Sequence, residues 1–196
     1  KKLILSLLVA AFVGGNTLSA QTITKNEDGK YSLSVGHVTL TVDAQKGGKI
    51  VSYRYDDKEM LSQTKIPNSF GSTFWTSPQS EWNWPPVPEY DTKPFNAEVA
   101  GDKLILTGEK SKRFGYRVRK ELTTDKKDNA IVITYTIINE SGETRKVAPW
   151  EISRVPNGGI LFFDAKEVTP ANNMETMPFV YEKKAAWYTL DESRKN

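Results

Sequence analysis

Short segments in which apolar and polar residues alternate recur along the chain, and this period of two constrains the fold more than any other feature. In residues 130–139, the apolar side chains at every second position are Ile131, Ile133, Tyr135 and Ile137. The other segments with a strand pattern are 37–44, 49–55, 96–100, 103–108, 116–123, 144–155 and 160–164. Glycine pairs and acidic turns separate these segments. Because no segment after residue 20 combines helix caps with helical apolar periodicity, we predict an all-β fold, a sandwich or barrel, in one domain.

The first twenty residues have the pattern of a secretory signal peptide. Lys1 and Lys2 precede an apolar run over residues 3–13, and small residues ending at Ala20 close the segment. The apolar run is too short to span a membrane, and the chain has no cysteine that would carry a lipid anchor. We therefore expect a signal peptide over 1–20, a β-sandwich domain over 21–196, and a periplasmic or secreted protein.

Charge and composition narrow the classes of partner and cofactor. The chain has 27 Lys and Arg against 24 Asp and Glu, which does not favour a nucleic-acid partner. A basic run from Lys110 to Lys120 includes an alternating strand pattern and predicts a solvated sheet face. Without cysteines, a phosphate-binding loop or histidine clusters, the sequence predicts no cofactor and no metal site. The single histidine, His37, is expected to be an ordinary surface or hydrogen-bonded residue.

Residues 70–95 form a stretch rich in aromatic residues and proline. The stretch contains seven aromatic residues and five of the ten prolines, so we predict a long irregular loop rather than a helix or a central strand. Flat aromatic rings beside polar side chains are typical of a sugar-binding cleft. The candidate ligand-binding residues here are Trp75, Gln79, Trp82 and Trp84. The alternative is a loop packed over a sheet edge, with its tryptophans as part of the core.

A second candidate site lies in residues 147–156, VAPWEISRVP. Read as a strand, this segment places Trp150 and Arg154 on one face and Glu151 on the other. Pro149 predicts an irregular strand with a bulge, which would re-aim these side chains toward a cleft. The alternative is an edge strand in which Glu151 and Arg154 pair with other surface charges.

Both candidate sites lie in sequence motifs that resemble a known family. The order GGKIVSYRYDDKEML, an aromatic stretch, YRVRKELTT and IVITYTIINES resembles the galactose mutarotase-like (aldose 1-epimerase-like) superfamily. The wording FWTSPQSEWNWPPVPEY with VAPWEISRVP resembles the bacterial domain-of-unknown-function family 4380. The resemblance covers residues 31–164. It implies a large two-sheet β-supersandwich with a sugar cleft on its concave sheet, incomplete at the C-terminus of this chain.

The same resemblance leaves the catalytic residues incomplete. Aldose epimerases use a histidine on the strand matching residues 148–151 and a glutamate near the C-terminus, but residues 148–151 read Ala-Pro-Trp-Glu. The glutamate would fall beyond Asn196. Glu151 is the candidate catalytic acid, provided that burial raises its pKa.

Three functions are consistent with the sequence. The first is a carbohydrate-binding protein for a hexose or uronic acid. Its stacking residues would be Trp82, Trp84 and Trp150, and its polar partners Gln79, Glu151 and Arg154. The second is an epimerase-like or other carbohydrate-active enzyme, and the third is a structural or interaction module with the tryptophans as core. Exposure of Trp82 and Trp84 separates the third function from the first two.

Overall fold

The computed structural model describes residues 22–64, 66, 69–165 and 179–190. The expected signal peptide over residues 1–20 lies outside the described residues. Strands dominate the rest, and the only helical elements there are η1 (Gln79–Glu81) and α1 (Pro88–Asp91). The predicted all-β class is therefore confirmed. No helix in the described part of the chain is long and apolar enough to cross a membrane.

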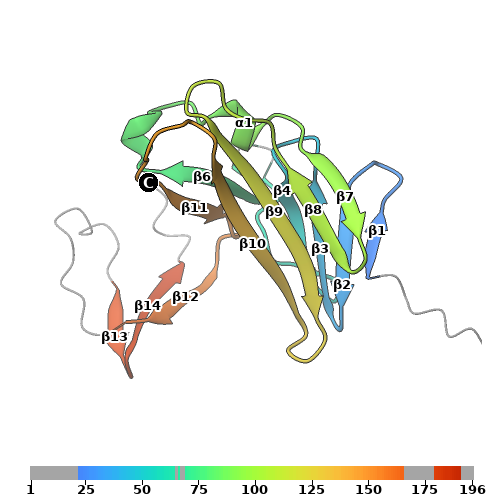
Figure 1. The fold of residues 1–196 in the computed structure, drawn as a ribbon. Helices are drawn as coiled ribbons and strands as arrows, with labels where there is room; N and C mark the ends of the chain where they lie inside the picture. Colours follow the sequence, from blue (N-terminus) through green and yellow to red (C-terminus); the bar gives the residue numbers. More distant parts are fainter. Residues whose placement is uncertain (1–21, 65, 67–68, 166–178, 191–196) are drawn as a thin grey trace, which may run out of the picture.

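Two antiparallel sheets pack face to face, and a third small sheet lies beside them (Figure 1). The strands of sheet A are β1 (Ile23–Lys25), β2 (Tyr31–Val35), β3 (Val38–Asp43), β4 (Lys49–Tyr55), β5 (Lys58–Glu59), β6 (Ser72–Ser77) and β11 (Ala148–Ser153). Their order is β1-β2-β3-β4-β6-β11, with β5 paired to β4.

Sheet B has the order β10-β9-β8-β7 and faces sheet A (Figure 1). Its strands are β7 (Asn96–Ala100), β8 (Lys103–Thr107), β9 (Tyr116–Asp125) and β10 (Ala130–Asn139). Sheet C has the order β12-β14-β13, and its strands are β12 (Gly159–Asp164), β13 (Val180–Glu182) and β14 (Ala185–Leu190).

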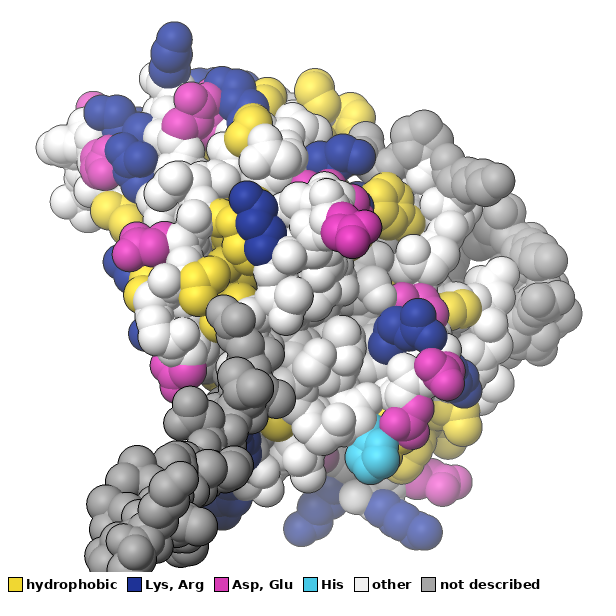
Figure 2. Space-filling view, turned by 90° about the vertical axis from the view of Figure 1, so that its right-hand side faces the viewer, with side chains coloured by type: hydrophobic (Ala, Val, Ile, Leu, Met, Phe, Trp, Pro, Cys, Tyr) yellow, Lys and Arg dark blue, Asp and Glu magenta, His cyan; other side chains and the backbone are white. Residues whose placement is uncertain are grey.

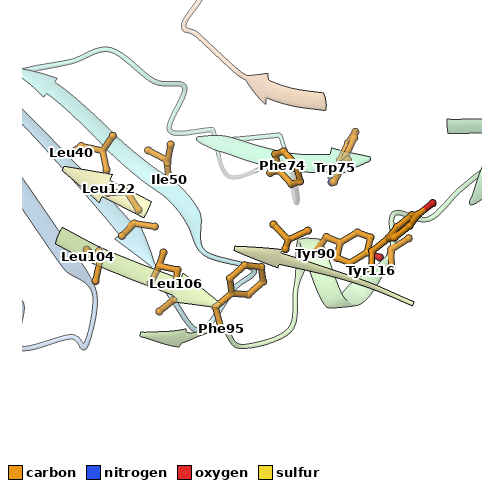
Figure 3. Close-up of a cluster of buried hydrophobic side chains, with 14 of the residues drawn as sticks. Leu40, Ile50, Phe74, Trp75, Tyr90, Phe95, Leu104, Leu106, Tyr116 and Leu122 are labelled. Carbon is orange, nitrogen blue, oxygen red and sulfur yellow. The ribbon is translucent and has the colours of Figure 1, made fainter. Parts of the chain in front are cut away.

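The core fills the space between sheets A and B, as the alternating sequence pattern predicts. Figure 3 shows side chains from the two sheets meeting there, with Leu40, Ile50 and Phe74 from sheet A. The buried residues from sheet B are Leu104, Leu106, Tyr116, Val118 and Leu122. On β10 the inward set is the predicted one, because Ile131, Ile133, Tyr135 and Ile137 all pack against this core. Burial of these apolar side chains is the main stabilising contribution to the sandwich.

The prediction of an irregular loop over residues 70–95 is wrong for its first part. Residues 72–77 form β6, a central strand of sheet A between β4 and β11. The five prolines of the stretch begin only at Pro78, so every residue of β6 keeps its backbone N–H for sheet pairing. Five of its six residues are buried, which suits its aromatic and β-branched side chains. The rest, residues 78–95, is a connection with η1 and α1.

The predicted bulge at Pro149 is also not observed. β11 pairs with β6 in continuous register from Ala148 to Ser153. β11 has β6 as its only neighbour within the described sheet A, so it is an edge strand and one of its sides needs no partner. A proline N that faces this open side removes no sheet hydrogen bond.

Candidate functional site

The two faces of β6 and β11 carry different chemistry. Trp150 lies opposite Trp75 in the register, and Glu151 lies opposite Phe74. Residues directly opposite each other in an antiparallel pair point to the same face. The Phe74 ring stacks on Tyr135 of sheet B at 4.7 Å, so the Phe74–Glu151 face points inward between the sheets. Trp75 and Trp150 therefore point outward from the sandwich.

The outward face carries a tryptophan cluster, which we define as Trp75, Trp82, Trp84 and Trp150. The Trp75 ring centroid lies 5.8 Å from that of Trp82, 5.9 Å from Trp84 and 5.6 Å from Trp150. All three contacts are edge-on, with interplanar angles of 69°, 84° and 85°. Edge-to-face packing is a favoured aromatic geometry, and it makes Trp75 the centre of the cluster.

Two members of the cluster are buried and hydrogen-bonded. Trp82 is 3% exposed, and its Nε1 donates to the Thr76 carbonyl oxygen at 2.9 Å. Trp75 is 7% exposed, and its Nε1 donates to Asp91 Oδ1 at 2.9 Å. Both indole N–H groups are thus satisfied inside the protein, and these two rings form the floor of the cluster.

The other two members offer ring surface to solvent. Trp84 is 65% exposed, and Trp150 is half-buried. The three predicted stacking residues therefore differ in exposure. Trp82 has no open face in this structure and serves as support, whereas Trp84 and Trp150 are available to a ligand.

The segment that carries Trp82 and Trp84 is fixed to the β3–β4 turn. Gly47 has φ of +63°, and a Cβ at this position would lie 2.3 Å from the Asp91 carbonyl oxygen. Only glycine allows this close approach. The Gly47 N–H also donates to the Lys93 carbonyl oxygen at 2.9 Å. The predicted turn at Gly47-Gly48 is thus confirmed, and it also seats residues 78–95.

A partly buried carboxylate connects the same segment to sheet B. Glu81 Oε1 lies 3.5 Å from the Tyr116 hydroxyl and 3.7 Å from Arg145 Nη1. Its Oε2 is buried and has no hydrogen-bond partner among the described residues. Burial and the charge of Glu81 raise the pKa of Tyr116, which therefore stays a neutral donor.

Two cationic side chains lie on the outward face, and one of them, Arg154, approaches the tryptophan cluster. Arg154 Nη1 donates to Thr73 Oγ1 at 3.2 Å, and the guanidinium carbon lies 5.9 Å from the Trp75 ring centroid. Lys49 is 5% exposed, and its Nζ lies 3.8 Å from the Phe70 ring centroid. Burial lowers the pKa of Lys49, and the charge of Arg154 lowers it further. Neither cation forms an ion pair within the part of the chain that the structure describes.

Gln79 lies on the exposed start of the connection, in η1. Its described contacts run through its backbone, because its carbonyl oxygen accepts from the N–H of Trp82 at 3.1 Å and of Asn83 at 2.7 Å. The side chain itself stays in solvent. It remains a predicted ligand-binding residue on position alone.

The inward face of the same strands borders a cavity of about 430 Å³ between the sheets. Its walls include Leu40, Ile50, Tyr53, Ile131, Ile133 and Tyr135. Glu151 also lines the cavity, and burial raises the pKa of its carboxyl, while the Ser153 hydroxyl, 3.2 Å from Oε1, opposes the shift. Much of the Glu151 side chain stays accessible at the open side of this cavity, so the desolvation is partial. The alternative in which Glu151 pairs with other surface charges is not observed among the described residues.

Lys120 is a buried charge that the sequence analysis did not single out. Its Nζ donates to the carbonyl oxygens of Gly47 at 2.8 Å and Gly48 at 2.9 Å. Three aromatic rings surround the amine at centroid distances of 5.3, 5.8 and 5.9 Å, those of Phe95, Tyr135 and Phe74. Burial lowers the pKa of Lys120 to about 7, and the charges of Glu151 and Asp91 oppose the shift. Lys120 thus connects sheet B to the turn that seats the tryptophan segment.

The predicted solvated face of the basic run holds for Arg117 and Arg119 and is wrong for Lys120. Arg117 pairs with Glu140 at 3.1 Å, and Arg119 pairs with Glu121 at 2.7 Å. Lys120 has the opposite parity in β9 and points into the core. Lys120 shares the even-numbered positions of β9 with buried apolar residues, and this alternation in the sequence indicates that its side chain points inward.

The single histidine lies on the surface, as predicted. His37 Nδ1 lies 2.6 Å from Asp56 Oδ1, and the ring stacks on Tyr55 at 5.5 Å. Figure 2 shows the histidine next to acidic side chains, on a face where basic and acidic groups are mixed. In the described residues, no three His, Cys, Asp or Glu side chains lie close enough to hold a metal ion.

Comparisons with known proteins show little similarity. No protein-family model and no curated protein matches the chain. Among solved structures, the chain is similar to the 4-α-glucanotransferase of Thermococcus litoralis, at 13% identity and a TM-score of 0.42. The match covers 72% of this chain and 28% of that enzyme's chain. Similarity at this level transfers neither the details of the fold nor an activity.

Proposed function

We propose that this protein binds carbohydrate on the outward face of sheet A, with Trp84 and Trp150 stacking on sugar rings. The observation that carries the proposal is the 65% exposure of Trp84, whose ring packs edge-on against the buried Trp75 ring. An indole face left open in this way matches the apolar face of a pyranose. Because Trp75 and Trp82 are buried, the platform is formed before a ligand arrives, which lowers the entropic cost of binding.

Polar groups around the platform suit the hydroxyls of a sugar. Arg154 approaches Trp75 and still has donors beyond its bond to Thr73. Gln79 is exposed at the start of the tryptophan segment. A few polar groups beside apolar rings are typical of small-ligand sites.

The export of this protein and its place among mutarotase-like supersandwiches are part of the same proposal. The charged start and apolar run of residues 1–13 support a periplasmic or secreted location. Two packed antiparallel sheets and the sequence motifs of residues 31–164 support the supersandwich relationship.

A second candidate function is acid–base catalysis at the inward cavity, and the raised pKa of Glu151 favours it. Glu151 points away from Trp84 and Trp150, so it does not reach a sugar that is stacked on them. A catalytic Glu151 would act on a different ligand, inside the cavity. Unchanged epimerase turnover in Glu151→Gln would remove this candidate.

The structural alternative also makes a distinct prediction. If all four tryptophans serve only as core, no sugar binds and Trp84 has no role beyond its packing on Trp75. The burial of Trp75 and Trp82 fits that function for these two residues, but the exposure of Trp84 does not.

The proposal is tested by titrating the full chain with a panel of hexoses and uronic acids, followed by intrinsic tryptophan fluorescence and calorimetry. We expect saturable binding that Trp84→Ala weakens by about tenfold or more. Phe162→Ala is the matched control, because Phe162 is 64% exposed on sheet C and lies outside the tryptophan cluster. Equal affinity of Trp84→Ala and wild type, or no binding of any sugar, would contradict the proposal.

A further inference from the structure

The outward face of sheet A contains a buried lysine, Lys49, that forms no ion pair among the described residues. Lys49 immediately precedes Ile50, which pairs with Ser72 on the inward face, so Lys49 belongs to the outward face with Thr73. Its side chain runs past Gly71, where an added Cβ would lie 3.5 Å from Lys49 Cε. Although only 5% of the residue is exposed, its Nζ has no protein acceptor or ion pair within the described ranges.

The two buried lysines, Lys49 and Lys120, differ in the described partners of their amines. Lys120 has two carbonyl oxygens as acceptors, at 2.8 and 2.9 Å. Among the described residues, the amine of Lys49 contacts the Phe70 ring, at 3.8 Å from its centroid. An aromatic ring attracts an ammonium but accepts none of its hydrogen bonds in the way that a carbonyl or carboxylate oxygen does. Within the described ranges, the Lys49 amine therefore has donors without an acceptor, and they are available to a ligand.

Arg154 places a second positive charge near Lys49. Arg154 is close enough to lower the pKa of Lys49, and Asp91 opposes this effect only as a weaker influence. Arg154 uses one nitrogen for both of its described hydrogen bonds, because Nη1 donates to Thr73 Oγ1 at 3.2 Å and to the Ile152 carbonyl oxygen at 3.5 Å. Its Nε and Nη2 have no acceptor among the described residues, and these are the donors of a bidentate contact to an oxyanion.

We propose that Lys49 and Arg154 bind the acidic group of a sugar that stacks on Trp84 and Trp150. This inference rests on the proposed carbohydrate-binding function and makes it more specific, because it selects acidic over neutral sugars. An oxyanion placed here would neutralise two adjacent cations and accept the hydrogen bonds that the protein leaves open. The carboxylate of a uronic acid is planar and fits the guanidinium fork. A sulfate or phosphate ester presents the same oxyanion chemistry.

Calorimetry with matched sugars gives the direct test on the unmodified full chain. Glucuronate and glucose differ at C6, where one has a carboxylate and the other a hydroxymethyl group. We expect glucuronate to bind at least about tenfold more tightly than glucose, and this preference to shrink at high salt. Glucose 6-sulfate and glucose 6-phosphate form a second arm, which distinguishes a carboxylate site from an ester site by which anion binds most tightly.

Charge-removing variants then assign the preference to the two cations. We expect Lys49→Met and Arg154→Gln each to reduce the preference for glucuronate over glucose by about tenfold, whatever smaller loss of glucose binding accompanies it. Lys126→Met is the matched control, since Lys126 is an exposed lysine in the β9–β10 turn and its loss changes net charge equally. Circular dichroism checks that each variant is folded. If a variant does not fold, the preference of the wild-type protein for glucuronate over glucose still tests the inference.

The outcomes separate this inference from the proposed function. Equal binding of glucose and glucuronate overturns the acidic-sugar inference and leaves carbohydrate binding in place. A preference that survives in both variants assigns the anion to other residues and also overturns it. Binding of neither neutral nor acidic sugars overturns both proposals.

Discussion

The two faces of β6 and β11 share a backbone and differ in almost everything else. The inward face carries Phe74 and Glu151 against an apolar cavity, whereas the outward face carries Trp75, Trp150 and Arg154. Inward aromatic packing joins the two sheets through the Phe74–Tyr135 stack. Outward aromatic packing joins β6 to residues 78–95 and leaves the rings of Trp84 and Trp150 partly open to solvent. One face therefore stabilises the sandwich, and the other is available for recognition.

This difference shows that neighbours in sequence need not share a site. Trp150 and Glu151 are adjacent, and both were candidates for one cleft. In a strand, adjacent side chains point to opposite faces, so these two residues lie in different environments. A site that is predicted from a strand sequence should therefore contain side chains from every second position, because only these share one face.

The largest expected effect separates the two kinds of tryptophan on the outward face. Trp82→Ala should destabilise the protein by about 3–5 kcal/mol, because it removes a buried ring and leaves the Thr76 carbonyl without its donor. Trp84→Ala should change stability by less than about 1 kcal/mol, since its ring is mostly exposed. Urea denaturation of both variants measures the difference. Similar losses of stability in the two variants would contradict the distinction between the supporting ring of Trp82 and the exposed ring of Trp84.

The second-largest expected effect is the pH dependence of stability that the buried amine of Lys120 causes. Lys120 has a pKa of about 7 when folded against an ordinary 10.5, so between these values the unfolded chain binds the extra proton. Stability should therefore rise as the pH increases from about 7 toward 9, by at most about 1.4 kcal/mol per pH unit. Below about pH 7 both states are protonated, and Lys120 adds no further slope.

Lys120→Met is the comparison variant for that slope, because it removes the titrating group and keeps similar bulk. Its free energy of unfolding should depend less on pH over the same range, as measured by urea denaturation at several pH values. Identical slopes in the variant and the wild type would show that Lys120 does not titrate in this window.

The smallest expected effect is that of Glu151→Gln on stability. Burial raises the folded pKa of Glu151, so the carboxylate is disfavoured in the folded state as the pH rises above its ordinary value of 4.5. The variant should be more stable than the wild type at pH 7 by less than about 0.5 kcal/mol, because solvent screens this partly exposed group. Near pH 3 the two should be equal, as both carry a neutral side chain. A destabilised variant at pH 7 would mean that the carboxylate makes a favourable contact on the inward face.

Much of the sandwich could be predicted because strand alternation records which side chains are buried. The inward set of β10 and the outward arginines of β9 follow from parity alone. The prolines that follow the central strand β6 obscure it in the sequence, because they make residues 70–95 as a whole resemble an irregular loop. Pro149 indicated an irregularity, but an edge strand accommodates proline without one.

The candidate site was predictable in composition and not in arrangement. The sequence indicates which tryptophans are close along the chain, but Trp82 is buried and Trp84 exposed because of how residues 78–95 fold back on β6. Lys49 and Arg154 are 105 positions apart, and only sheet pairing brings their strands to either side of β6. Such long-range placement has no local signal in the sequence.

Saturation-transfer NMR on the full chain, with glucose and glucuronate, tests the central claim that recognition takes place on the outward face. Three proteins suffice, namely wild type, Trp84→Ala and Glu151→Gln. We predict transfer to sugar ring protons in wild type and in Glu151→Gln, and its loss in Trp84→Ala. Transfer that persists in Trp84→Ala and disappears in Glu151→Gln would place the ligand in the inward cavity and contradict this account.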